Sequence, residues 1–268
     1  MNLHEKAFKI AHSFLKEHNL EDNWNVLKHD FQYYLGYNKN PILDESKVTL
    51  GASKIRGLPH LPDSFEFLPG ELFIAQLNLS DIKPYDFNNI LPEKGILHLF
   101  LDESTSLSRC SYYDGSFENL KVRPYPKQKT KLYDKKEFLN ESYTIDFTDN
   151  EIVNLGKNNF EKILGNKFKD LTARLKEQLG NALVINDLLY CDGTPNNFVF
   201  GEPRFYQDEY IEMEYDEMDD GYPSYSSSYT LLFCMSYGEG HVNFFIKGDV
   251  LDISKDINNQ IVAIYSGT

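Results

Sequence analysis

The stretch SKIRGLPHLP, residues 53–62, holds side chains of the types that bind ligands. Arg56 carries a permanent positive charge that can bind an anion, and a histidine such as His60 can titrate near neutral pH. Two amide side chains follow Gly-x-Pro segments. Gln76 lies in a β-like run after the first segment, and Gln207 lies shortly after a second one. Together these four side chains predict a small-molecule or substrate site between two halves of the chain.

A second feature is the acidic segment YQDEYIEMEYDEMDDGY, residues 206–222, which has eight acidic side chains, no basic one and four tyrosines. Charge at this density repels itself, so burial in the core is not expected. The segment is either a solvated surface loop or a docking surface on which carboxylates steer a basic protein and tyrosines supply apolar area. The residues assigned to the docking surface are Tyr210, Tyr215, Asp216, Glu217, Asp219, Asp220 and Tyr222.

Established catalytic and metal motifs are missing from the sequence. There is no HExxH, no phosphate-binding GxxxxGK[ST] or GxGxxG, and no GxSxG nucleophile elbow. The acidic segment lacks the ligand order of an EF-hand. The three cysteines, Cys110, Cys191 and Cys234, form no CxxC pair, so neither a disulfide framework nor a cysteine-rich zinc site is expected. We therefore expect no cofactor, no metal and no catalytic residue.

Charge and hydropathy restrict the partners. The net charge of −14 disfavours nucleic acid and anionic membranes and favours a basic protein partner. No apolar run approaches the roughly 20 residues of a membrane span, and the N-terminus does not resemble a signal peptide. We expect a cytoplasmic protein, and the oligomeric state is left open.

The chain reads as one globular unit of class α+β, residues 1–268. Apolar spacing predicts helices within residues 1–36, the second running from Asp22 to a stop at Gly36. Short β-like runs fill a first β-rich half, residues 47–150, where Asp114-Gly115 predicts a type I′ hairpin. A central helix is predicted over residues 159–180, and a second β-rich half over residues 183–268. Within that half, Gly238-Glu239-Gly240 precedes a strand-like run and predicts a tight hairpin turn.

The two β-rich halves echo one another in sequence. Gly57-Leu58-Pro59 returns as Gly201-Glu202-Pro203, and two strand-like runs follow in each half. This order predicts an internal duplication, with two similar halves packed as one body. Because the Gly-x-Pro repeats but the arginine and histidine do not, the first stretch is interpreted chiefly as a stiff bend, with glycine free in φ and proline fixing it.

These motifs resemble the YwqG-like family of bacterial proteins, which is defined by sequence and has no assigned function. The resemblance rests on Gly57 to Pro62, on Phe73 to Leu77 with its central glutamine, on Leu91 to Gly95, on Phe200 to Pro203, and on Gly238 to Gly240. It extends from about residue 47 to the end and implies a duplicated α+β fold without an activity. Genes of this family are associated with toxin loci, which implies an immunity protein as one form of partner binding.

Two functional hypotheses result. The first is a non-enzymatic module that binds a basic protein, in one form a toxin-neutralising immunity protein, through the acidic segment. The alternative is an enzyme or small-molecule binder whose site lies between the halves at Arg56, His60, Gln76 and Gln207.

Overall fold

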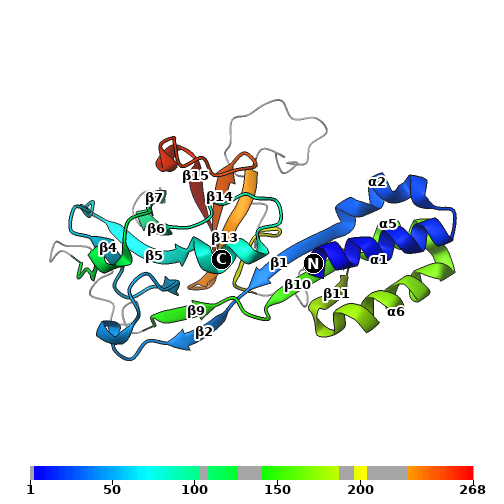
Figure 1. The fold of residues 1–268 in the computed structure, drawn as a ribbon, viewed down its shortest axis with the longest axis horizontal. Coiled ribbons are helices and arrows are strands. Elements are labelled where there is room, and N and C mark those ends of the chain that lie inside the picture. Colours follow the sequence, from blue (N-terminus) through cyan, green and yellow to red (C-terminus); the bar gives the residue numbers. More distant parts are fainter. Residues whose placement is uncertain (1–2, 103–107, 126–140, 187–195, 204–228, 268) are drawn as a thin grey trace.

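The computed structural model describes residues 3–102, 108–125, 141–186, 196–203 and 229–267. These residues form an α+β fold with three β-sheets, a helical part at one end and a β-rich body at the other (Figure 1). The helices are α1 (Leu3–Glu17), α2 (Trp24–Leu27), α3 (Leu79–Ile82), α5 (Lys157–Leu164) and α6 (Phe168–Leu179).

The largest sheet of the described chain has seven strands and runs through both parts of the molecule. In spatial order they are β11 (Leu183–Asn186), β10 (Glu151–Gly156), β1 (Phe31–Gly36), β12 (Phe198–Val199), β13 (Tyr229–Tyr237), β14 (Gly240–Lys247) and β15 (Ile261–Gly267). Neighbouring strands are antiparallel except β10 and β11, which are parallel.

A six-stranded sheet and a two-stranded sheet complete the β-structure of the described residues. The six strands are, in order, β2 (Asn38–Pro41), β9 (Tyr143–Asp146), β3 (Lys54–Ile55), β5 (Glu71–Asn78), β6 (Ile96–Asp102) and β7 (Ser108–Tyr113). The small sheet pairs β4 (His60–Pro62) with β8 (Leu120–Val122).

The six-stranded sheet and the β12–β15 end of the seven-stranded sheet share one hydrophobic core. Leu97 and Leu99 alternate inward along β6, and Val242 and Phe244 do the same along β14, since side chains two residues apart share a face. A second core lies where α1, α5 and α6 cover β1 and β10, with Phe14 and Leu171 among its fully buried side chains. The β-rich body and the helical part are therefore joined by one continuous sheet.

Three local predictions were wrong. Residues 31–36 form strand β1 and not the end of a helix, because Phe31 to Leu35 pair residue by residue with β10. The central helix is interrupted at Gly165, whose φ of +54° ends α5 before α6 begins. Asp114-Gly115 does not close a hairpin, since β8 pairs with β4 and not with β7.

Two other predictions were confirmed. The class is α+β. Gly238-Glu239 makes the tight turn between β13 and β14, in which Tyr237 pairs with Gly240 and Gly238 has a φ of +58°. No helix in the described part of the chain has the length and apolar character required to cross a bilayer.

The two echoed hairpins share one irregularity. The pairing of β5 with β6 shifts register between Phe73 and Ala75, and the pairing of β13 with β14 shifts between Leu231 and Phe233. Such bulges bend a strand and increase its twist. This likeness agrees with the predicted duplication, which remains a prediction.

Candidate functional site

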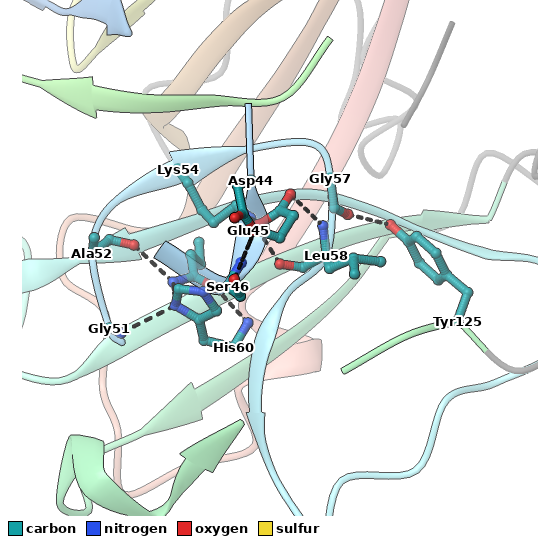
Figure 2. Close-up of polar contacts among 11 residues, drawn as sticks. Asp44, Glu45, Ser46, Gly51, Ala52, Lys54, Gly57, Leu58, His60 and Tyr125 are labelled. Carbon is teal, nitrogen blue, oxygen red and sulfur yellow. Dashed lines mark hydrogen bonds and ion pairs between the residues drawn. The ribbon is translucent and has the colours of Figure 1, made fainter. Parts of the chain in front are cut away.

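The first Gly-x-Pro segment makes a bend that requires glycine. Arg56 and Gly57 both have left-handed backbone angles, with φ of +56° and +68°. A Cβ on Gly57 would lie 1.9 Å from Glu45 Oε1 and 2.6 Å from Ser142 Cβ. The Gly57 carbonyl accepts a hydrogen bond of 3.1 Å from the Tyr125 hydroxyl (Figure 2). Glu45, Ser142 and Tyr125 therefore all lie against the bend at Gly57.

A buried ion pair lies under this bend. The Lys54 side chain is fully buried, and its ammonium pairs with Glu45 and donates to the Leu58 carbonyl at 2.8 Å (Figure 2). The other Glu45 oxygen accepts from the Leu58 N–H at 3.0 Å. Burial lowers the pKa of Lys54, and the nearby carboxylate partly opposes that shift. Glu45 therefore contacts the chain on both sides of the bend, at Lys54 on β3 and at Leu58.

His60 on β4 and Gln76 on β5 form one buried hydrogen-bonded unit that joins the two-stranded sheet to the six-stranded sheet. The Gln76 carbonyl oxygen accepts from the His60 N–H at 2.8 Å, and its amide nitrogen donates to the Ala52 carbonyl at 2.7 Å. His60 Nδ1 lies 3.1 Å from that amide nitrogen and 3.2 Å from the Gly51 nitrogen, both donors. Nδ1 is therefore an acceptor, and the ring proton is on Nε2.

The expectation that His60 titrates near neutral pH was wrong. Its side chain is fully buried, and burial, followed by the charge of Lys54, lowers its pKa to about 4. His98 on β6 lies beside it, with Nε2 2.9 Å from the His60 carbonyl, and its complete burial likewise lowers its pKa to about 4. Both rings are neutral at pH 7, which suits structural hydrogen bonding better than acid–base catalysis.

Arg56 is engaged elsewhere. Its guanidinium forms an ion pair of 2.6 Å with the half-exposed Glu141 and lies 5.7 Å from the centre of the Tyr237 ring. The structure thus brings His60 and Gln76 into direct contact and pairs Arg56 with a surface carboxylate. The fourth predicted residue, Gln207, lies outside the described residues.

The second Gly-x-Pro segment makes a similar bend beside a cavity. Phe200 and Gly201 have φ of +62° and +88°, and a Cβ on Gly201 would lie 2.4 Å from the Tyr34 ring. The cavity has a volume of about 400 Å³ and is partly open to solvent. Its lining includes Tyr33, Tyr85, Phe87, Gly201, Glu202 and Tyr229.

The cavity lies where the helical part meets the β-rich body, since β1, β13 and the turn after α3 all contribute. Two aromatic side chains of its wall, Tyr33 and Phe87, have ring centres 4.7 Å apart. His4 stacks nearly parallel on Phe87 at 6.2 Å, and burial lowers its pKa, so it is neutral at pH 7. No local pattern in the sequence predicts this cavity, because its described lining comes from five separate segments of the chain.

The acidic segment lies outside the described residues, and with it Tyr210, Tyr215, Asp216, Glu217, Asp219, Asp220 and Tyr222. The described chain stops at Pro203 before this segment and resumes at Tyr229, the first residue of β13. Glu202 and Tyr229 both line the cavity. The cavity is therefore lined by residues that precede and follow the undescribed stretch 204–228 in the sequence.

Metal and thiol chemistry find no support in the described part of the chain. It contains no group of three or more His, Cys, Asp or Glu side chains arranged to hold a metal ion. Cys110 is a buried free thiol, and burial raises its pKa; Cys234 is buried as well. Cys191 lies outside the described residues.

The fold and these contacts define an α+β protein with a buried polar network beside its first glycine bend and a cavity beside its second. Family comparison matches residues 53–255 to a domain of unknown function, DUF1963. Because this match covers more than half of the sequence, the chain belongs to the DUF1963 family. No curated protein matches the sequence.

Proposed function

We propose that this protein is a non-enzymatic module that binds a basic protein through its acidic, tyrosine-rich segment. One observation carries the proposal: the surplus negative charge is concentrated in a single stretch. Residues 206–222 hold eight of the 41 acidic residues and none of the 27 basic ones, so the rest of the chain has a net charge of only −6. A local surplus of this kind attracts a basic partner and increases its rate of association.

The described residues support this proposal by the way their basic groups are used. Lys54, Arg56, Lys83, Arg109 and Arg174 each form an ion pair with an acidic side chain of the same chain. These internal pairs offset part of the acidic charge of the body. They leave the segment as the largest local excess of charge in the sequence.

An enzyme acting through Arg56, His60 and Gln76 is less well supported. His60 and Gln76 satisfy one another in a buried network, and Arg56 has a carboxylate partner. A substrate would have to replace these contacts before it met the side chains. The immunity-protein form, which follows from the YwqG-like resemblance, specifies the basic partner as a toxin domain and remains part of the proposal.

The proposal is tested by affinity capture from the native cell, with bound proteins identified by mass spectrometry. The bait proteins are the wild type, the variant D216N/E217Q/D219N/D220N, and a control, E66Q/E161Q/D170N/E177Q. The control loses the same amount of charge from exposed positions of the described body. We expect one basic protein that the wild type and the control retain and the segment variant loses.

Equal recovery of that protein by all three baits would contradict the proposal. Recovery of no basic protein by the wild type would contradict it as well.

A further inference from the structure

We propose that the cavity beside Gly201 receives a cationic side chain, arginine or lysine, from the basic partner. The inference rests on the proposed function, because it assumes that the partner is basic. It adds a specific binding site among the described residues, where the acidic segment provides only attraction. Three features of the cavity lead to it: aromatic walls, surrounding carboxylates, and the absence of Lys and Arg from its described lining.

The aromatic lining of the cavity comes from separate segments of the chain. Tyr33 and Phe87 lie with their rings in contact and are partly exposed, and Tyr85 also lines the cavity. Tyr229 contributes from the start of β13. Faces of aromatic rings attract ammonium and guanidinium groups, and the attraction grows when the cation is withdrawn from water.

Carboxylates give the same region a negative potential. The Tyr33 hydroxyl donates to Glu151 at 3.2 Å. Burial raises the pKa of Tyr85, and the charges of Glu151, Asp149 and Asp146 raise it further, which places these acids within electrostatic reach of its hydroxyl. Such an arrangement favours a cation and disfavours an anion.

Three further ionisable groups of the lining, Asp86, His4 and Glu202, do not oppose a cation. Asp86 is buried and accepts from the Ile90 and Leu91 N–H groups at 2.9 and 2.8 Å and from Lys83 at 3.2 Å, so its charge is already compensated. His4 is neutral at pH 7 because burial lowers its pKa. Glu202 lines the cavity, and burial raises the pKa of its carboxyl group, an effect that an entering cation would oppose by pairing with the carboxylate.

Size and position fit a single side chain. A volume of about 400 Å³ lies near the lower end of the range of about 300–1,000 Å³ for small-ligand sites. The cavity is bordered by Glu202 and Tyr229, which flank the acidic segment in the sequence. A partner attracted by the segment would therefore meet the cavity, and a buried cation on aromatic rings is a typical anchor of a protein interface.

The test uses a small probe, so that it does not depend on the partner. Nα-acetyl-arginine amide is titrated into the full chain and compared with Nα-acetyl-citrulline amide, which has nearly the same shape without the charge. Binding is followed by calorimetry and by NMR shifts. We expect the arginine probe to bind with a Kd on the order of 1 mM, as suits a ligand of this size. The citrulline probe should bind at least about tenfold more weakly.

Two substitutions locate the binding. F87L removes one aromatic face and E202Q removes one carboxylate, and each should weaken the arginine probe about three- to tenfold. The matched controls are F67L and E66Q, which change an aromatic and an acidic residue that do not line the cavity. E202Q alters an exposed side chain, so it stays informative if F87L fails to fold.

Equal affinity for the two probes would overturn the inference, as would no detectable binding of the arginine probe or unchanged binding by F87L and E202Q. The proposed function fails separately. If the segment variant D216N/E217Q/D219N/D220N loses the basic partner while the arginine probe does not bind, the cavity is refuted and the docking segment is supported. If the arginine probe binds but no basic protein is captured, the cavity is supported as a cation site and the docking segment is refuted.

Discussion

Acid should destabilise this protein through two buried histidines, His60 and His98, between about pH 6.5 and pH 4. Both rings are neutral in the folded protein, with pKa values of about 4, whereas an unfolded chain titrates histidine near 6.5. In this interval the unfolded state binds more protons, so the free energy of unfolding falls as the pH falls. Below pH 4 both states are protonated and the loss is complete.

The magnitude follows from the difference in pKa. For a ring with pKa values of 4 folded and 6.5 unfolded, the loss is about 2 kcal/mol at pH 5 and about 3 kcal/mol at pH 4. His98 is fully buried and should show this effect in full. His60 is also buried, and its Nδ1 already accepts from two donors and cannot take a proton without losing both, so it should add a loss of the same sign.

The assay is urea unfolding of the wild type and of H98Q at pH 7.5, 6, 5 and 4.5. Glutamine can still donate to the His60 carbonyl but cannot ionise. The informative quantity is the decline in the free energy of unfolding below its value at pH 7.5, which a different starting stability of H98Q does not affect. We expect the decline from pH 7.5 to pH 5 to be about 2 kcal/mol smaller in H98Q than in the wild type. Identical declines would refute the argument that this ring is held neutral.

The bend and its ion pair give two further predictions. G57A should lower the free energy of unfolding by about 2–4 kcal/mol, because its methyl group would lie 1.9 Å from Glu45 Oε1 and the alanine would have a strained left-handed backbone. The control is G180A, where φ is +57° and no atom lies within 4 Å of the added methyl group. G180A should lower the free energy of unfolding by only about 1–2 kcal/mol. Equal losses in urea unfolding would show that close contact at Gly57 is unimportant. E45A should lower the free energy of unfolding by about 3 kcal/mol, because it leaves the buried Lys54 ammonium without its counterion. The double variant E45A/K54M should be more stable than E45A, because the uncompensated charge is removed. If the double variant loses as much stability as the two single variants added together, the coupling is excluded.

Local patterns in the sequence predicted several elements correctly. The helix within residues 3–17 has its apolar side chains at three- and four-residue spacing, and that stripe packs on the sheet. The Gly238-Glu239 turn needs only a glycine between two strand-like runs, and both are adjacent in sequence. Such features depend on neighbouring residues alone.

Features that depend on distant residues were missed. Strand β1 reads FQYYLG. Phe31 packs with the helices, Leu35 packs in the core of the β-rich body, and Tyr34 packs in a third cluster on the other face of the strand. Apolar and aromatic residues therefore occur on both faces, and periodicity cannot separate this pattern from a helix. The Asp114-Gly115 hairpin failed because the following segment pairs with β4, some 60 residues earlier in the sequence. Local turn chemistry contains no information about that partner.

The candidate site shows the same limit. Arg56, His60 and Gln76 were selected by residue type, yet their roles depend on Glu141, Gly51 and Ala52, which only the fold brings near. The buried pairing of Lys54 with Glu45 was not anticipated either, since a lysine beside an apolar residue usually indicates an exposed position. The acidic segment was identified by charge alone, and its role remains a proposal.

The most direct test of the central claim is the rate at which the captured basic protein associates with this chain. Stopped-flow association is measured at low and high ionic strength, about 20 and 300 mM, for the wild type, for D216N/E217Q/D219N/D220N and for the matched control E66Q/E161Q/D170N/E177Q. We predict that the segment variant associates about tenfold more slowly at low salt and loses most of its salt dependence, while the control stays near the wild type. Equal rates and equal salt dependence for the segment variant and the control would contradict the claim that the segment is the docking surface.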